Sequence, residues 1–445
     1  MSDFARVERA LAARIPGKDE IPKMRPDIAR MHLLVDLLGQ PQKSYPSIHL
    51  TGTNGKTSTT RMVDALLRAF GLRPGRYTSP HLTTVRERIA IDGVPVDEET
   101  FARAYDEVAP YLALVDERSE QRVTFFETLT ATAYAAFADA PVDVAVVEVG
   151  MGGQWDATNV LEAGTCVVTP VGLDHPELGS TVTEVATEKA GIVHAGARVI
   201  SGVQELAAAE VLVARCASVG AELAVEGVHF GVLERHVAVG GQMVTLRGLG
   251  GEYGEVFLPL HGAYQASNAA CALAAVEAFL GGGSALLDIE SVRAGFASCD
   301  SPGRLEVVRR SPTVLLDGAH NPGGVAALVG ALEEAFTFSR LVGVVAILSD
   351  KDVASMLSLL EPVLSDVVVT TNHSPRALSA DALGALAAEV FGPDRVVVEP
   401  LLPNAIDAAV ALADDAGEGA GVLVTGSLYT VGEARTLLLG GPEHW

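Results

Sequence analysis

The chain has 445 residues, of which 56 are acidic and 32 are basic, and its formal net charge is −24. A surface with this charge repels phosphate backbones and anionic lipids, which excludes nucleic acids and membrane surfaces as expected partners. Hydrophobic residues make up 49% of the sequence, enough for the cores of two or three domains of roughly 100 to 200 residues each.

Cysteine usage and the N-terminal segment bear on where the protein works. The cysteines show neither CxxC nor Cys/His metal spacing, so we expect free thiols in a reducing compartment. They are Cys166, Cys216, Cys271 and Cys299. Residues 1–14 carry charges throughout and lack the apolar core of a secretory signal. The longest apolar runs fall far short of the ~20 residues of a membrane span, so we expect a cytoplasmic protein.

Strands and helices alternate along the first half of the chain. Apolar, β-branched runs at 48–51, 142–149 and 166–171 predict buried strands, and residues 57–70 carry the apolar face of a helix. This alternation predicts an α/β fold with a doubly wound, mainly parallel sheet.

The pattern changes between about residues 222 and 260. Alternating apolar and polar runs are interrupted there by Gly240-Gly241, which predicts a small antiparallel β subdomain. A helix at 266–280 and an interdomain linker at 298–303 should follow. A second alternation then predicts a Rossmann-like C-terminal α/β domain. Its expected strands are 313–316, 341–348, 367–370 and 422–425, and its expected helices are 325–336, 353–360 and 404–413.

The strongest local signal is a Gly-rich segment between the first strand and its helix. It reads Thr51-Gly52-Thr53-Asn54-Gly55-Lys56-Thr57-Ser58. In such a loop glycines let backbone N–H groups face phosphate oxygens, Lys56 adds positive charge, and the hydroxyl of Thr57 or Ser58 can face Mg²⁺. Leu50 stands where the general pattern has its first Gly, and the alternative is an incidental turn. The position between strand and helix favours a phosphate-binding loop.

Polar side chains at the ends of two other predicted strands point to the same place. Glu148 ends one strand, and Asp174 with His175 follows the next. Ligands of open α/β sheets bind at the carboxyl ends of strands, so these residues should share a crevice with the loop. A lone carboxylate is usually just solvated and a lone His is usually structural. Beside a phosphate loop, however, Glu148 is a candidate metal ligand.

A series of short motifs runs along the chain in a fixed order. In the first half they are Gly52-Thr53-Asn54-Gly55-Lys56, Ser79-Pro80-His81-Leu82, Glu148-Val149-Gly150-Met151-Gly152-Gly153, Asp156-Ala157-Thr158-Asn159, Gly172-Leu173-Asp174-His175 and Glu188-Lys189-Ala190-Gly191-Ile192. Later come Pro302-Gly303-Arg304-Leu305-Glu306, Asp317-Gly318-Ala319-His320-Asn321-Pro322 and Thr425-Gly426-Ser427-Leu428-Tyr429. From about residue 25 to residue 435, this ordered set resembles the folylpolyglutamate synthase/dihydrofolate synthase family of the Mur ligase superfamily.

The resemblance implies a function and a domain plan. It implies an ATP-binding central domain at residues 1–298 and a glutamate ligase domain at residues 302–445. ATP would convert an acceptor carboxylate to an acyl phosphate, which the amino group of L-glutamate would attack with release of phosphate. The implied acceptors are dihydropteroate and the glutamate tail of reduced folates, and both activities are expected. The implied state is a monomer.

The same resemblance implies metal ligands. Ser79 and Glu148 would hold one Mg²⁺, and Glu148 and His175 would help to hold a second. Lys189 matches a lysine that is carbamylated in the superfamily and so becomes a metal-ligating carboxylate; otherwise it reads as a surface lysine paired to Glu188. A monovalent cation is also among the implied cofactors.

Further residues match nucleotide and substrate positions of the family. Asn268 would contact adenine, Arg304 would reach the phosphates across the interdomain cleft, and Asp317 with His320 would close the active site. The segment around Asp317 and His320 reads alternatively as an ordinary turn.

Two weaker candidate substrate residues and three departures from the family pattern remain. Arg88 and Ser427 are candidates for the carboxylates of the incoming glutamate, against a surface ion pair and a tight turn as alternatives. Thr57 replaces a common Gly, which restores a hydroxyl after the lysine. Tyr264 stands where His is common near adenine, and Gln154 stands where Arg is common near the acceptor pocket.

Two other functions fit parts of the pattern. A cell-wall Mur ligase would add an amino acid to a UDP-linked peptide, but the roughly 50 residues ahead of the phosphate loop are too few for a UDP-binding domain. A non-catalytic nucleotide switch would use ATP only to close two domains. Such a switch does not require Glu148, His175, Lys189 and the Asp317–His320 cluster together.

Overall fold

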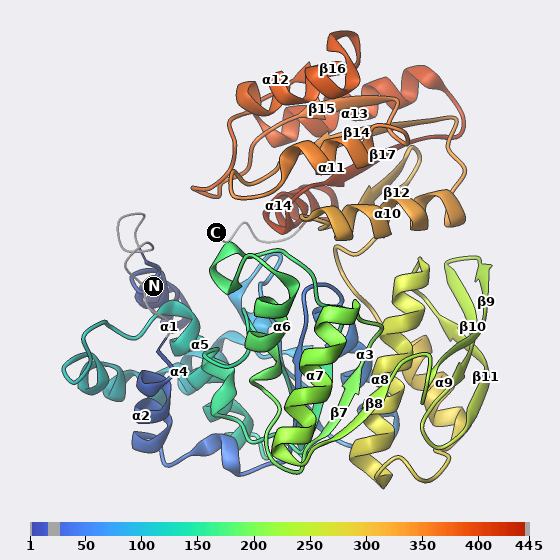
Figure 1. Cartoon of the computed structure of the whole chain (residues 1–445). Helices are drawn as coiled ribbons and strands as arrows, with labels where there is room; N and C mark the ends of the chain where they lie inside the picture. The colour runs from blue at the N-terminus through green and yellow to red at the C-terminus, as the bar shows by residue number, and fades with distance from the viewer. Residues whose placement is uncertain (1, 17–26, 441–445) are drawn as a thin grey trace.

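The computed structural model describes residues 2–16 and 27–440, which form two α/β lobes. The C-terminal lobe, orange to red in Figure 1, lies against the end of the larger N-terminal lobe. The chain passes between them after α9 (Ile289–Ala297) and enters β12 (Glu306–Arg310). The α/β architecture expected from the sequence is confirmed.

An eight-stranded sheet organises the N-terminal lobe, in the order β4-β3-β2-β5-β1-β6-β7-β8. The strands from β2 to β8 in this order pair in parallel, whereas β3 and β4 are antiparallel additions at one edge. Their bounds are β1 Ser47–Thr51, β2 Pro74–Tyr77, β3 Ile89–Ile91, β4 Val94–Pro95, β5 Val144–Glu148, β6 Thr165–Val168, β7 Arg198–Ser201 and β8 Glu222–Val225.

Helices cover both faces of this sheet, and for this reason its central strands are apolar on both sides. In β5, Ala145 and Val147 pack into one hydrophobic cluster, and Val144 and Val146 pack into another on the opposite face. The first cluster includes α1 (Asp3–Ala12), α2 (Ala29–Leu37), α4 (Glu98–Asp116) and α5 (Phe125–Asp139). The second cluster includes α3 (Lys56–Ala69), α8 (Ala263–Gly281) and α9. A third hydrophobic cluster forms around β6 and β7 and includes α6 (Val182–Ala190) and α7 (Leu206–Val219).

A separate antiparallel sheet, at the right of Figure 1, packs against α8. It consists of β9 (Gly231–Ala238), β10 (Gly241–Arg247) and β11 (Glu252–Leu258). Its start differs from the expected residue 222, because Glu222–Val225 pairs in parallel with β7 as the edge of the large sheet. A four-residue edge strand carries too little alternation to be told from the hairpins that follow it.

The C-terminal lobe is built on a six-stranded sheet in the order β12-β13-β17-β14-β15-β16, parallel except for β12. Its further strands are β13 Thr313–Leu316, β14 Arg340–Val345, β15 Asp366–Val369, β16 Val396–Val398 and β17 Ala420–Thr425. Its helices are α10 Pro322–Ala335, α11 Val353–Leu360, α12 Ala380–Phe391, α13 Leu402–Ala416 and α14 Leu428–Leu439. Because β17 lies between β13 and β14, the strand order reverses there, and a crevice opens at such a point.

Two expectations about the compartment can be compared with the structure. All four cysteines are buried and free, as expected from their spacing. Over residues 2–16 and 27–440, no helix is long and apolar enough to cross a bilayer.

Candidate active site

A cleft of about 840 Å³ lies between the lobes, where the carboxyl ends of strands from both sheets face one another. Its walls include the loop after β1, the end of β5 and the segment after β6 from one lobe. The other lobe contributes the segments that follow β13, β14 and β17. The arrangement therefore gathers strand ends of two α/β sheets around one space, as the sequence led us to expect.

The loop after β1 needs its glycines. Gly52 and Gly55 have φ angles of +144° and +88°. A Cβ on Gly52 would lie 1.9 Å from the Thr169 hydroxyl oxygen, and one on Gly55 would lie 2.4 Å from Asn268 Oδ1. The loop can therefore lie close to its neighbours only because both positions lack side chains. It leads directly into α3, whose N-terminal N–H groups form an anion site.

Lys56 lies inside this loop. Its Nζ donates to the carbonyl oxygens of Gly52 at 3.0 Å and Thr53 at 3.2 Å. Burial lowers the pKa of Lys56, and the neighbouring carboxylates Glu148 and Asp174 oppose that shift. The ammonium is thus a desolvated cation at the mouth of a phosphate loop, where its charge is only weakly screened.

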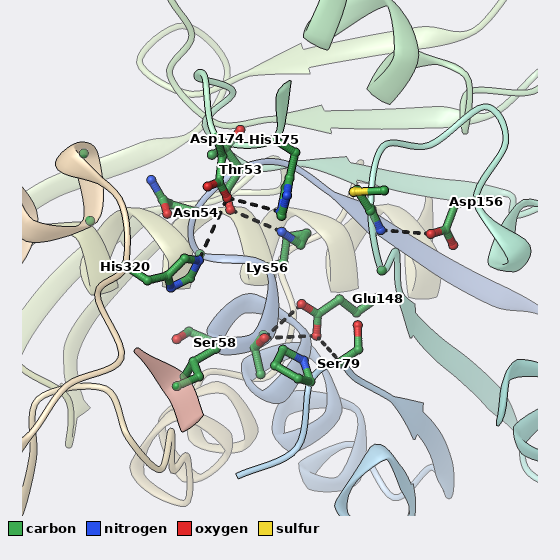
Figure 2. A pocket seen from close by; sticks show the side chains of 18 of the residues that line it. Thr53, Asn54, Lys56, Ser58, Ser79, Glu148, Asp156, Asp174, His175 and His320 are labelled. Carbon is green, nitrogen blue, oxygen red and sulfur yellow. Dashed lines mark hydrogen bonds and ion pairs between the residues drawn. The ribbon is translucent and has the colours of Figure 1, made fainter. Parts of the chain in front are cut away.

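Glu148, at the end of β5, faces the first hydroxyl after this lysine. Its oxygens accept hydrogen bonds from Thr57 Oγ1 at 2.9 and 3.0 Å and from the Ser79 backbone N at 3.3 Å (Figure 2). Burial raises the pKa of Glu148, and Lys56 counteracts this. Ser58 points elsewhere: its hydroxyl contacts Ser301 Oγ at 2.9 Å. Thr57 is therefore the hydroxyl that shares a site with Glu148 and Ser79.

Asp174 contacts a lysine and two histidines, which come from both lobes. Lys351 Nζ lies 2.6 Å from Asp174 Oδ1, and the Nε2 atoms of His175 and His320 lie 3.5 and 3.9 Å from Oδ2. Burial alone would raise the pKa of Asp174, but these neighbours outweigh it and hold the pKa below its ordinary value. Burial also lowers the pKa of His175, and it lowers that of His320 to about 4. No motif in the sequence singles out Lys351, which acquires its partner only when the two lobes pack together.

Lys189 lies behind the phosphate loop. Its Nζ donates to Gly52 O at 2.8 Å, and the residue is 4% exposed. Burial, and then the nearby charge of Lys56, lower the pKa of Lys189 to about 7. The alternative of a surface lysine paired to Glu188 does not describe this position. Glu188 instead accepts a hydrogen bond from the Trp155 backbone N at 3.1 Å.

The C-terminal lobe presents Asp317 and Arg304 to the cleft. Asp317 Oδ2 accepts from the Leu305 backbone N and Oδ1 accepts from the Ala319 backbone N, both at 2.8 Å. Burial raises the pKa of Asp317, and Arg304 opposes the shift. The Arg304 charge also acts on Lys56 of the other lobe. The candidate residue Arg304 is thus close enough to both lobes to respond to a bound triphosphate.

The remaining candidates also line the cleft. Asn268 lines it and donates from Nδ2 to Gln265 Oε1 at 3.0 Å. Ser427, the N-cap of α14, accepts from the Tyr429 backbone N at 3.2 Å and lines the same space. Arg88 also lines it and is only 8% exposed, so the alternative of a surface ion pair does not hold. Asn54 exchanges side-chain hydrogen bonds with Asn321 of the opposite lobe, at 3.1 and 3.4 Å.

Part of the cleft lining was not expected from the sequence. Phe126 and Trp155 line the cleft, as do Arg30 and Glu127, which form a buried ion pair at 3.0 Å. Glu127 also closes a capping box with Thr124 at the start of α5. The capping pattern Thr-x-x-Glu was visible in the sequence, but the place of Phe126, in α5, and of Trp155 in the cleft lining was not.

Family models and known proteins show what this chain is similar to. The Mur ligase middle domain model matches residues 50–276, and the Mur ligase glutamate ligase domain model matches residues 303–428. Dihydrofolate synthase/folylpolyglutamate synthase of Mycobacterium tuberculosis (strain ATCC 25618 / H37Rv) is 48% identical, over 100% of this chain and 95% of its own length. The protein of the same name from Escherichia coli (strain K12) is 32% identical, over 92% of this chain and 91% of its own length.

Solved structures give the same result. Folylpolyglutamate synthase of M. tuberculosis complexed with ADP superimposes with a TM-score of 0.94 at 49% identity, over 99% of both chains. A complex of folylpolyglutamate synthase with AMPPCP and folate superimposes with a TM-score of 0.85 at 30% identity, over 99% of this chain and 100% of that one. Fold and cleft together define an ATP-dependent ligase of the Mur type. The chain belongs to the dihydrofolate synthase/folylpolyglutamate synthase family, and the resemblance read from its motifs is confirmed.

Proposed function

We propose that this cleft joins L-glutamate to the carboxylate of dihydropteroate and of reduced folates at the expense of ATP. One observation carries the proposal. The phosphate loop with Lys56 and the buried carboxylate Glu148 line the same space as Arg304 and Lys351 of the C-terminal lobe. The named relatives are dihydrofolate synthases and folylpolyglutamate synthases, which supports both activities.

The phosphate loop and its surroundings define where ATP would lie. Its β- and γ-phosphates would lie against Lys56 and the N-terminus of α3, because these groups offer a positive charge and unpaired N–H donors. Asn268 lies beside Gly55, so the adenosine would extend towards α8. Arg304 would neutralise phosphate charge from the opposite lobe. Solved structures of family members complexed with ADP and with AMPPCP support ATP as the nucleotide.

The residues beside Lys56 fit a magnesium ion. Thr57, Ser79 and Glu148 supply oxygen atoms, the ligand type that Mg²⁺ prefers. Among residues 2–16 and 27–440, no group of three or more His, Cys, Asp or Glu side chains is placed to hold a metal alone. That suits Mg²⁺, which usually takes one or two protein ligands and completes its shell with water and phosphate oxygens. His175 is the candidate beside a second ion. Bound Mg²⁺ would offset the negative charge of the phosphates and the acceptor carboxylate.

The chemistry follows from bringing anions together. An acceptor carboxylate oxygen attacks the γ-phosphorus of ATP, the bond to the β-phosphate oxygen breaks, and ADP leaves. The glutamate nitrogen then attacks the acyl carbon, loses a proton, and expels inorganic phosphate as the amide forms. Lys56, Arg304 and the α3 N-terminus lower the barrier by neutralising charge and aligning the reactants. His320, which lines the cleft 3.9 Å from Asp174, is the candidate to receive the amine proton.

Lys189 fits a carbamate. The reaction with CO₂ requires a neutral amine, whose nitrogen bonds to the carbon and releases a proton. A pKa of about 7 leaves a large neutral fraction at physiological pH, unlike that of an ordinary lysine. The product would be an anion beside Lys56, which would replace repulsion between two ammonium groups by attraction. We therefore propose Lys189 as the site of this modification.

Different residues of the cleft suit different substrates. Phe126 and Trp155 line the cleft and suit a flat pterin ring, which stacks on aromatic side chains. Lys351 and Arg376 line the cleft from the C-terminal lobe and suit the two carboxylates of glutamate, together with Ser427 and Arg88. The acyl carbon would then lie beside Glu148 and Lys56.

The assay that tests this function uses ATP, magnesium, glutamate and either dihydropteroate or tetrahydrofolate. Release of ADP that depends on both glutamate and acceptor, with a product one glutamate heavier, supports the proposal. Nucleotide binding without glutamate-dependent turnover would favour an ATP-driven switch. Turnover only with a UDP-linked peptide would favour a cell-wall ligase.

Three broader assignments accompany the function. We place the boundary between the ATP-binding and glutamate ligase domains at residues 299–301, where the chain leaves α9. We also propose a monomer, because both lobes of one chain supply the walls of the cleft. The four buried free thiols support a cytoplasmic location.

A further inference from the structure

Arg88 reaches the cleft from an unusual setting. It ends the 3₁₀ turn Val85–Arg88, is 8% exposed, and lines the same space as the phosphate loop. Its guanidinium carbon lies 5.3 Å from the ring centroid of Phe125. Burial of a guanidinium is unfavourable unless its donors are satisfied, as for any buried ion. Its local partners therefore decide which of its donors a ligand can use.

One of those partners is His81. Arg88 Nε donates to His81 Nδ1 at 2.9 Å. An arginine cannot give up its proton, so Nδ1 must be the acceptor and cannot carry a hydrogen. This fixes the ring as the neutral tautomer with hydrogen on Nε2. The hydrogen bond to His81 and the position over the Phe125 ring together define how the guanidinium of Arg88 is oriented.

That orientation matters for recognition of a carboxylate. A guanidinium binds carboxylates bidentately through two parallel N–H groups, and the geometry tolerates little rotation. Nε is engaged by His81, and Tyr77 also shares a hydrogen bond with the guanidinium. The donors that remain for a ligand are therefore on the terminal nitrogens. The side chain that orients these donors need not touch the ligand.

We propose that His81 is a positioning residue for glutamate recognition, because it holds the Arg88 guanidinium with its terminal nitrogens towards a carboxylate of the incoming amino acid. The proposal rests on the proposed function, in which Arg88 contacts glutamate. His81 would then orient Arg88 as a neutral hydrogen-bond acceptor. This role differs from the metal and proton-transfer roles proposed for His175 and His320.

The test replaces the acceptor and follows each substrate separately. His81→Phe keeps a flat ring but removes the acceptor. It should raise the KM for glutamate about tenfold, the factor expected from losing one hydrogen bond to a charged group, while the KM values for ATP and the acceptor stay within about twofold. His81→Asn places an amide oxygen where Nδ1 lies and should restore the glutamate KM to within about threefold. His236→Phe, on exposed strand β9 away from the cleft, is the matched control.

A double-mutant cycle separates positioning from a general loss of structure. Arg88→Lys removes the planar fork and should raise the glutamate KM, and adding His81→Phe to it should have little further effect. Should His81→Phe fail to fold, as judged by its thermal melting, His81→Gln takes its place. It keeps a polar group but moves the acceptor by one methylene, and it should raise the same KM.

The outcomes are distinct. Equal increases in all three KM values, additive effects of the two substitutions, or an unchanged glutamate KM in folded His81→Phe would each overturn the proposal. If Arg88→Lys and His81→Phe instead raise the KM of the folate acceptor alone, Arg88 serves that substrate and the inference about glutamate is rejected. Neither result affects the ligase function, which fails only if the unmodified chain forms no glutamylated product.

Discussion

Lys351 of the C-terminal lobe donates a 2.6 Å hydrogen bond to Asp174 of the N-terminal lobe, with both side chains less than 9% exposed. The pair joins the segment after β14 to the segment after β6 inside the cleft. Removal of one partner from a buried ion pair commonly costs about 3 to 5 kcal/mol, because the other charge is left unsatisfied. The pair therefore favours the arrangement in which the two lobes face each other.

Lys351→Met should loosen that arrangement. We expect kcat/KM for ligation to fall at least about tenfold. Because the pKa of Asp174 is held below its ordinary value, the pair stabilises the fold above about pH 4 and this contribution is lost as pH falls through the folded-state pKa. The variant should therefore unfold at a higher pH on acidification. Acid titration followed by circular dichroism, with exposed Lys43→Met as control, checks this; identical midpoints would contradict it.

Lys56→Ala should remove the cation of the phosphate loop. The rate of ADP release should fall by ~10² to 10³-fold, since an electrostatic stabiliser of the transferring phosphate is lost in a desolvated site. Folding should be preserved, because Lys56 contacts only carbonyl oxygens of its own loop. Stopped assays of ADP, with thermal melting as the folding control, measure both. Near-normal turnover would refute the assignment of the loop.

Activity should depend on CO₂ if Lys189 is carbamylated. With a pKa of about 7, the amine is mostly neutral at pH 8 and mostly protonated at pH 6. Enzyme depleted of CO₂ should therefore lose activity and should recover on addition of bicarbonate faster at pH 8 than at pH 6.

A variant provides the second arm of this experiment. Lys189→Ala should reduce turnover severely and should be rescued in part by short carboxylates such as acetate, which can occupy the vacated space. Activity of Lys189→Ala equal to that of the unmodified chain would exclude the carbamate from the reaction.

Arg304→Ala should separate ligation from folding. The charge of Arg304 acts on Lys56 of the N-terminal lobe and on Asp317 of the C-terminal lobe. Arg304 lies in the segment that joins the two lobes. Without it, kcat should fall about 10²-fold or more while the melting temperature changes little. Comparison of kcat with the Kd for ADP separates catalysis from binding. A large loss of stability with unchanged kcat would show that Arg304 is structural.

Much of this fold follows from local patterns in the sequence. β13 and α11 lie at the predicted residues, because each has a single clear period and a defined boundary. The helix α12, the strand β16 and the helix α14 were not predicted. The helices α12 and α14 each contain an internal glycine, and β16 has only three residues.

The site was predictable where a backbone motif carries the chemistry and was not where tertiary contacts do. The loop at Gly52–Lys56 and the strand-end Glu148 have signals of their own in the sequence. Lys351, by contrast, acquires its role only when β14 is brought opposite Asp174. The choice of Thr57 over Ser58 also depends on the direction in which α3 leaves the loop, which no local pattern reveals.

The central claim is that an acceptor carboxylate oxygen becomes bonded to the γ-phosphorus of ATP in this cleft. Dihydropteroate labelled with ¹⁸O in its carboxylate tests it directly, with ATP, magnesium and glutamate at natural abundance. If an acyl phosphate forms, mass spectrometry of the released phosphate will show one ¹⁸O atom per product amide. Unlabelled phosphate alongside glutamylated product would contradict the account.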